Sequence, residues 1–192
     1  NKVKKLKRNN LLLVTKISST MKKKKGKKIQ LCDIIENEIK DNSLRNGFPK
    51  SFDSHIKQLK TKKIINHKDF TDIPFVTIDG QDSKDFDDAV WSETKTGITN
   101  IMIAISDVSF FIEKNDPLDL EAKKRGNSFY FPDRVIPMFP NEISNDICSL
   151  IPNKERASVI TEIKIKNFKV ISFKIHRAKI ISVARLTYNE VD

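Results

Sequence analysis

The part of this sequence with the clearest chemical potential is a short acidic run. Five aspartates fall within ten positions: Asp79, Asp82, Asp85, Asp87 and Asp88. Carboxylates held this close raise one another's pKa values unless a cation neutralises them. Ligands that offer only oxygen favour hard divalent cations, namely Mg²⁺, Mn²⁺ or Ca²⁺. The run therefore predicts either a metal site or a polar loop whose acids cap helices and pair with lysines.

The spacing separates some of these readings. A calcium loop of the EF-hand type that began at Asp79 would need glycine where Lys84 stands and glutamate where Val90 stands, so this reading fails. Magnesium takes few protein carboxylates and leaves positions for water and phosphate oxygens, which suits phosphoryl chemistry. The apolar segment 74–79 before the run and "AVW" at 89–91 after it favour a fixed site over a loose loop.

Strand-like segments surround the acidic run. "PFVTID" at 74–79 is apolar and β-prone, and "TNIMIAISDVSFFI" at 99–112 is a nearly continuous apolar run, typical of a strand buried on both faces. Segments 157–166 and 170–186 alternate as strands do. With the helices described next, this pattern predicts an α+β fold with a mixed sheet and flanking helices.

Four helices are expected. The helix at 115–126 has a capping aspartate, Asp116, at its start and Gly126 at its end. A short helix at 187–192 carries a capping-box pair, Thr187 and Glu190. Two earlier helices, within residues 31–72, read as a connector. Their apolar faces are Leu31, Ile34, Ile35 and Ile39 in the first helix, and Phe52, Ile56 and Leu59 in the second.

The charge of the chain is unevenly distributed. The formal net charge is +11, and residues 1–30 contain twelve Lys or Arg and no acid, leaving 24 basic against 25 acidic residues. Such a basic segment attracts polyanions, although a solvated lysine-rich tail has the same composition. No apolar run approaches the ~20 residues of a membrane span, and no secretory signal is visible. The two isolated cysteines indicate reduced thiols in the cytoplasm.

Several long blocks, taken together, resemble a known family. "FVTIDGQDSKDFDDAV", "IAISDVSFFI", "LDLEAKKRGNSFYFPDRVIPMFPNEISNDICSL" and "ARLTYNEV" are similar to the RNB catalytic domain of the ribonuclease II/ribonuclease R family, nearest the ribonuclease R branch. The resemblance runs from about residue 31 to 192 and is closest over 75–150. It implies a processive, magnesium-dependent 3′-to-5′ exoribonuclease that releases nucleoside 5′-monophosphates from single-stranded RNA.

The resemblance also implies roles for the aspartates. Asp79 and Asp88 match positions that bind Mg²⁺, with Mn²⁺ as an alternative ion, and Asp85 matches a position that helps to shape the metal site. Asp87 matches the aspartate tied most directly to catalysis. Asp82 lies at a variable place in the pattern, so we expect it to face solvent. No cofactor beyond the metal is implied, and no membrane partner; the sequence does not indicate an oligomeric state.

One aromatic residue is implied in RNA binding. In "NSFYFPDR", Tyr130 matches the family tyrosine that stacks on a base near the 3′ end of the RNA. Phe129 and Phe131 are expected in the core, because alternate residues of a strand face one side, and Tyr130 then points the other way. Stacking of this kind tolerates any base, which fits cleavage without sequence preference.

The resemblance covers part of the family's architecture. We expect residues 1–30 to form a basic segment at the end of a preceding cold-shock/OB domain, 31–72 the helical connector, and 73–192 the N-terminal part of the RNB domain. The family's catalytic arginine, a glutamate and an S1 domain would follow Asp192. An inactive remnant that only binds RNA or metal is therefore the alternative function, and the sequence beyond Asp192 would distinguish the two.

Overall fold

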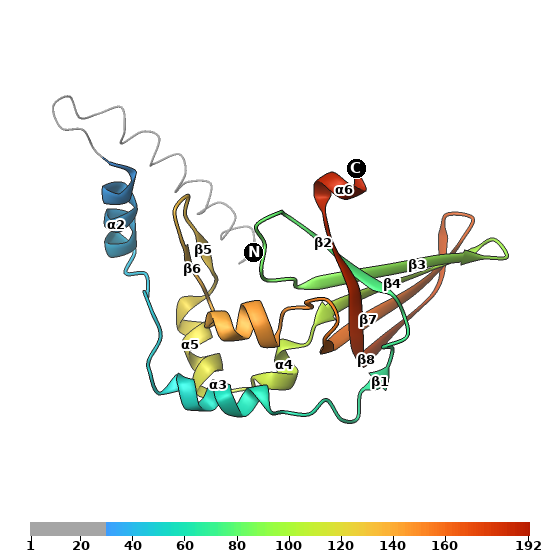
Figure 1. Cartoon of the computed structure of the whole chain (residues 1–192), viewed down its shortest axis with the longest axis horizontal. Coiled ribbons are helices and arrows are strands. Elements are labelled where there is room, and N and C mark those ends of the chain that lie inside the picture. The colour runs from blue at the N-terminus through green and yellow to red at the C-terminus, as the bar shows by residue number, and fades with distance from the viewer. Residues whose placement is uncertain (1–29) are drawn as a thin grey trace. The chain divides into compact units, whose positions relative to one another are not determined.

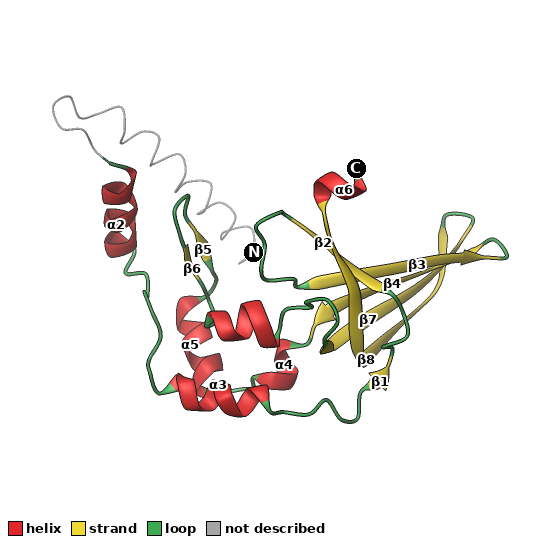
Figure 2. Cartoon of the chain, in the orientation of Figure 1, coloured by secondary structure: helices red, strands yellow, loops and turns green. Residues whose placement is uncertain are grey.

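The computed structural model describes residues 30–192, which form two compact units (Figures 1 and 2). The smaller unit combines residues 30–47 with Phe129–Ile136, and the larger combines Phe48–Ser128 with Pro137–Asp192. The predicted basic segment lies outside the described residues, except for its last position. Within residues 30–192, no helix is both long enough and apolar enough to cross a membrane.

The smaller unit packs one helix against a short hairpin. Helix α2 spans Leu31–Asp41, and the hairpin pairs β5 (Phe129–Tyr130) with β6 (Val135–Ile136). The predicted helix is confirmed, and Ile34, Ile35 and Ile39 are buried. Leu31 was wrongly placed on the buried face: it is 44% exposed, because it occupies the first helical position. The core shared by helix and hairpin comprises Ile35, Ile39, Phe131 and Ile136.

The larger unit is built on a mixed sheet, which confirms the predicted α+β class. Its strands follow the order β1-β8-β2-β3-β4-β7, and β7 also pairs with β8, so the pairings close into a ring. The β1–β8 and β2–β8 pairs are parallel and the other pairs are antiparallel. The six strands are β1 (Lys68–Asp69), β2 (Phe75–Asp79), β3 (Asp88–Lys95), β4 (Ile98–Ser106), β7 (Glu155–Lys166) and β8 (Lys169–Thr187).

The long strand β8 closes this ring. Its first part pairs with β7 and its last part, from Ser182 to Thr187, pairs with β2. Figure 1 shows the β3–β4 and β7–β8 turns at the same end of the sheet. The interior of the sheet holds fully buried side chains, among them Phe75, Ile160 and Ile180.

Most helices of the larger unit gather beside the sheet, and the last one lies apart from them at the end of β8 (Figure 2). The predicted helices are confirmed: α3 has its apolar stripe buried, α5 begins after the Asp116 cap, and α6 follows Thr187, whose backbone N–H donates to Glu190 Oε2 at 2.6 Å. A buried cluster joins α3, α4, α5 and the π-helical turn η1. The bounds are α3 Phe52–Lys60, α4 Val108–Phe111, α5 Pro117–Arg125, η1 Ile143–Ile147 and α6 Tyr188–Val191.

The prediction that the apolar run 99–112 forms one strand buried on both faces is wrong. Strand β4 ends at Ser106, and α4 follows it. The Asp107 carboxylate accepts a hydrogen bond from the Phe110 backbone N–H at 3.1 Å, so Asp107 caps a helical turn that competes with the strand. Within β4, Met102 and Ala104 are buried whereas Ile105 is 48% exposed. The strand therefore buries one face.

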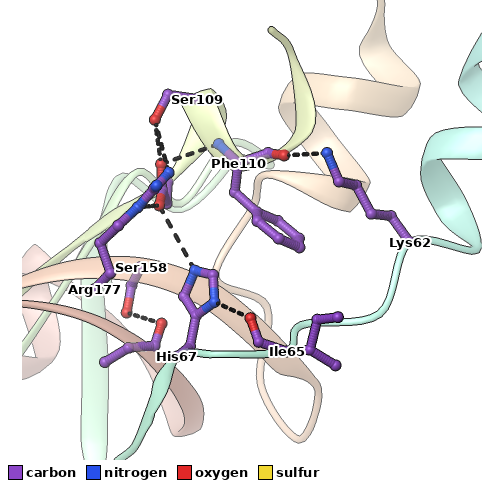
Figure 3. A network of polar contacts seen from close by, with 9 residues as sticks. Lys62, Ile65, His67, Ser109, Phe110, Ser158 and Arg177 are labelled. Atoms are coloured by element: carbon purple, nitrogen blue, oxygen red, sulfur yellow. Dashed lines mark hydrogen bonds and ion pairs between the residues drawn. The ribbon is translucent and has the colours of Figure 1, made fainter.

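A polar network surrounds the Asp107 carboxylate (Figure 3). Arg177 Nε of β8 donates to its Oδ2 at 2.8 Å, and Ser109 Oγ donates to its Oδ1 at 2.6 Å. The buried His67 ring places Nε2 3.8 Å from Oδ2, while its Nδ1 lies 3.0 Å from the Ile65 carbonyl oxygen. This network joins the end of β4 to β8 and to the segment before β1.

Candidate active site

The acidic run forms the connection between two strands of the sheet. Asp79 is the last residue of β2 and Asp88 is the first of β3; we call Asp79–Asp88 the aspartate loop. Asp79 is in register with Thr187 of β8, and Asp88 is in register with Ile105 of β4. Each end of the loop is therefore fixed to a neighbouring strand of the ring.

The four carboxylates at positions that match the family, Asp79, Asp85, Asp87 and Asp88, interact electrostatically with one another. Partial burial and the charges of Asp88 and Asp85 raise the pKa of Asp79, although Arg185 opposes the shift. Partial desolvation and the charges of Asp85, Asp88 and Asp79 raise the pKa of Asp87. Burial is the largest cause of both shifts, and the neighbouring carboxylates add the repulsion expected from the sequence.

Asp82 differs from the other four in its electrostatics. Its side chain is exposed, as predicted, but so are those of Asp87 and Asp88, whereas Asp79 and Asp85 are half-buried. Asp82 is not among the charges that shift the pKa of Asp79 or Asp87. This difference in electrostatics, and not exposure, distinguishes Asp82 from the four family positions.

The aspartate loop offers oxygen donors of the kind that a divalent metal binds. No group of three or more His, Cys, Asp or Glu side chains in residues 30–192 is arranged so that it could hold a metal ion as it stands. The donor chemistry nevertheless fits such an ion, because the four mutually repelling groups offer hard oxygen atoms alone. A cation would relieve the repulsion that raises the pKa values of Asp79 and Asp87.

Backbone and side-chain hydrogen bonds fix the second half of the aspartate loop. The Phe86 N–H donates to Ser149 Oγ at 3.0 Å, and Ser149 Oγ donates to the Lys84 carbonyl at 2.9 Å. The Leu150 N–H donates to the Phe86 carbonyl at 2.8 Å, and the Ser106 N–H donates to the Asp87 carbonyl at 2.9 Å. The Phe86 ring is buried in the sheet core, so the loop is anchored between Asp85 and Asp87.

Arg185 of β8 contacts the first half of the loop. Its Nη2 donates to the Gly80 carbonyl at 3.0 Å and also to the Gln81 carbonyl. Its guanidinium carbon lies 5.3 Å from the centre of the Phe86 ring. Arg185 and Ser149 were not singled out from the sequence; each lay inside a block that resembles the family, but nothing local pointed to the loop.

Tyr130 belongs to the smaller unit and lies on β5. Its side chain is 70% exposed, whereas Phe131 is 9% exposed and Phe129 packs partly buried against the same core. The predicted orientation is therefore confirmed, and the stacking role stays a prediction. The nearby Arg134 is held by Glu36 at 2.6 Å and Asp133 at 2.9 Å.

The fold and the acidic loop agree with a family assignment. Residues 67–192 match the family model of the RNB domain. The match includes the whole sheet of the larger unit and the aspartate loop. The chain belongs to the RNB family.

Its relatives are ribonucleases R. The chain is 39% identical to ribonuclease R of Buchnera aphidicola from Schizaphis graminum over 194 residues, which covers 96% of the chain and 26% of the relative. It is 45% identical to ribonuclease R of Escherichia coli over 125 residues, or 64% of the chain and 15% of the relative. The solved Mycoplasma genitalium RNase R, in complex with ribose-methylated single-stranded RNA, superposes with a TM-score of 0.80 at 32% identity.

The extent of these matches matters for function. The Mycoplasma comparison covers 86% of this chain and 27% of that one. Both the Buchnera and the Mycoplasma relatives match most of this chain, and the chain spans about a quarter of the length of each. The matches agree with the predicted ribonuclease R branch.

Proposed function

We propose that this chain supplies the first part of the catalytic domain of a 3′-to-5′ exoribonuclease. The reaction is processive, magnesium-dependent hydrolysis of single-stranded RNA to nucleoside 5′-monophosphates. One observation carries the proposal. The four aspartates that match family positions lie on one loop fixed between β2 and β3, where the charges of Asp85 and Asp88 help to raise the pKa values of both Asp79 and Asp87. Asp82, outside those positions, takes no part in either pKa shift.

The aspartates divide the work. Asp79 and Asp88 would hold Mg²⁺, or Mn²⁺ in its place, and Asp85 would shape the metal site. When bound, the cation supplies Lewis-acid stabilisation of charge on the phosphate oxygens. Asp87 lies on the same loop as these carboxylates and would be the aspartate tied most directly to catalysis.

RNA contacts would use stacking and charge. Tyr130 presents an exposed ring that would stack on a base near the 3′ end. The basic residues 1–30 would attract the phosphate backbone. The Mycoplasma relative has been solved with ribose-methylated single-stranded RNA and with double-stranded RNA, which supports RNA as the substrate here. We also propose that the protein acts in the cytoplasm. Its chain would consist of a basic segment (1–30), a helical connector (31–72) and the N-terminal part of the RNB domain (73–192).

A second candidate is an RNA- or metal-binding module without turnover. One observation favours it for the 192 residues by themselves: the chain spans about a quarter of the length of its matched relatives. The two candidates predict different fates for bound RNA.

One gel assay separates them. The chain is incubated with 5′-labelled single-stranded RNA, with Mg²⁺ or with EDTA, beside Asp87→Asn. The matched control is Asp82→Asn, which removes one charge from the same loop outside the family positions. Processive exonuclease action gives a Mg²⁺-dependent loss of full-length RNA and the appearance of a short 5′-labelled end product with few intermediates; both are absent in Asp87→Asn and kept in Asp82→Asn. RNA that is retarded on a native gel yet intact in every lane supports the second candidate.

Three results would contradict the exonuclease proposal in specific ways. Equal turnover by Asp87→Asn and the parent removes Asp87 from catalysis. Shortening of the RNA that persists in EDTA would contradict the dependence on a metal. Release of the 5′ label as a mononucleotide at the start of the reaction would show attack from the 5′ end.

A further inference from the structure

The aspartate loop is held largely from outside itself. Inside it, the Ser83 N–H donates to the Gly80 carbonyl at 3.1 Å. Other contacts come from Ser106, from the Ser149–Leu150 segment after η1, and from Arg185 of β8. A loop that carries repelling carboxylates needs such contacts, because repulsion alone would spread it.

We propose that Ser149 and Arg185 are positioning residues that hold the two halves of the aspartate loop, so that its carboxylates face one another. The effect on metal binding rests on the proposed function, whereas the holding of the loop rests on the hydrogen bonds described above. Neither residue would touch RNA or metal in this role. Each would act through the backbone that carries the aspartates.

Ser149 pins the backbone on both sides of Asp85. Its hydroxyl accepts from the Phe86 N–H at 3.0 Å and donates to the Lys84 carbonyl at 2.9 Å, so both capacities of the hydroxyl are used. The residue is fully buried, at 0% exposure, so water cannot replace these bonds. Removing the hydroxyl would leave a buried N–H and a carbonyl unpaired.

Arg185 pins the backbone that follows Asp79. A single nitrogen of Arg185, Nη2, donates to the carbonyls of both Gly80 and Gln81, and the guanidinium lies near the Phe86 ring that Ser149 also helps to fix. Lysine would keep the positive charge near Asp79 but would carry it on a flexible stem, without the planar group that lies near Phe86. The substitution Arg185→Lys therefore tests geometry while it preserves charge.

Two controls lie in the same sheet, and their side chains bond to residues outside the aspartate loop (Figure 3). Ser158 is a fully buried serine of β7 whose Oγ donates to the Ala178 carbonyl at 3.3 Å, and Ser158→Ala matches Ser149→Ala. Arg177 lies on β8 with Arg185 and binds Asp107 and Ser109. Arg177→Lys therefore matches Arg185→Lys.

The first measurement is amide hydrogen exchange followed by NMR, without metal. In Ser149→Ala we expect exchange at the Phe86 amide to speed up by about tenfold, since its buried acceptor is lost. Amides in the centre of β4 should keep their parent rates, and Ser158→Ala should leave Phe86 unchanged. Parent-like exchange at Phe86, or equal acceleration throughout the sheet, would overturn the positioning role.

The second measurement is the affinity for Mn²⁺, read from the EPR signal of the free ion. We expect Ser149→Ala and Arg185→Lys to raise the dissociation constant about tenfold, as supporting residues of metal sites do. Ser158→Ala and Arg177→Lys should stay near the parent value, and RNA affinity in EDTA should not change. Unchanged Mn²⁺ affinity in both test variants, with a parent that binds Mn²⁺, would refute the inference.

The two readouts keep the inference separate from the proposed function. A parent chain that binds no Mn²⁺ contradicts the metal site, whereas the exchange experiment still decides whether Ser149 holds the loop. Conversely, a parent that binds Mn²⁺ with variants that exchange and bind as it does leaves the metal site intact and removes the positioning role.

Discussion

The Asp107 network allows a stability prediction that separates a helix cap from an ion pair. Asp107 is 2% exposed, caps α4 through the Phe110 N–H at 3.1 Å and accepts from Arg177 Nε at 2.8 Å. Asp107→Ala removes both contacts, together with the hydrogen bond from Ser109 Oγ to the same oxygen that caps the helix. Asp107→Asn keeps an oxygen that can cap the helix, since asparagine caps as well as aspartate, but removes the charge.

The magnitudes follow from the exposure of each partner. Loss of the cap costs about 1 kcal/mol. The pair with Arg177 contributes about 1 kcal/mol, a reduced figure because the Arg177 side chain is 55% exposed and screened by water. We therefore expect the free energy of unfolding to fall by about 2 kcal/mol in Asp107→Ala and by about 1 kcal/mol in Asp107→Asn.

Urea unfolding at neutral pH measures these changes. With an m-value of about 2 kcal/mol/M, the midpoint should fall by about 1 M in Asp107→Ala and by about half as much in Asp107→Asn, with m unchanged. Equal losses in the two variants would refute the capping argument. A parent-like midpoint in Asp107→Asn would refute the contribution of the charge.

The pH dependence gives the same reasoning an independent check. Burial alone would raise the pKa of Asp107, but hydrogen bonds from Arg177 and Ser109 outweigh it and hold the pKa below its usual value of 3.8. The unfolded chain therefore binds this proton more readily, and the charge stabilises the fold above pH 3.8. The advantage of the parent over Asp107→Asn should be full near neutral pH and should vanish as the pH falls through the folded-state pKa. An advantage that grows on acidification would contradict the sign.

Two further variants test the aromatic residues. Tyr130→Ala should weaken RNA binding about tenfold by loss of one stacked base and leave thermal stability unchanged, because the side chain is 70% exposed; fluorescence anisotropy measures the affinity, and Val135→Ala, its exposed neighbour across the hairpin, is the control. Phe75→Ala should lower the free energy of unfolding by about 3–5 kcal/mol, because Phe75 is fully buried. A midpoint near that of the parent in urea would contradict this.

Elements with local signals were predictable from the sequence. The helix at 115–126 carries its own start and stop: the Asp116 carboxylate accepts from the Leu118 N–H at 2.7 Å, and Gly126 ends the helix with a φ of 81°. The end of β4 was not predictable, because the apolar run continues past it. There the Asp107 cap outweighs the strand pattern, which shows how one side chain can override periodicity.

In the candidate site, too, residues with a local sequence signal were predictable and residues without one were not. The aspartates stood out because their repulsion is a local property of ten residues; in the folded chain, burial and then this repulsion raise the pKa of Asp87. Ser149 and Arg185 did not stand out, because neither residue type is unusual where it stands. Their proposed role follows from hydrogen bonds to residues that are distant in the sequence. The partners lie 63 and 65 positions away from Ser149, and 104 and 105 positions away from Arg185.

These separations bear on how the site forms. Asp79 reaches its final environment only when β2 pairs with the end of β8, where it lies in register with Thr187. Arg185 stands two residues before Thr187, so the pairing that completes the ring also brings its guanidinium onto the loop. Contacts this distant in sequence are slow to form, because loop closure must precede them. The carboxylates therefore come together as a consequence of ring closure, and the segment 77–90 alone would carry the charges without the arrangement.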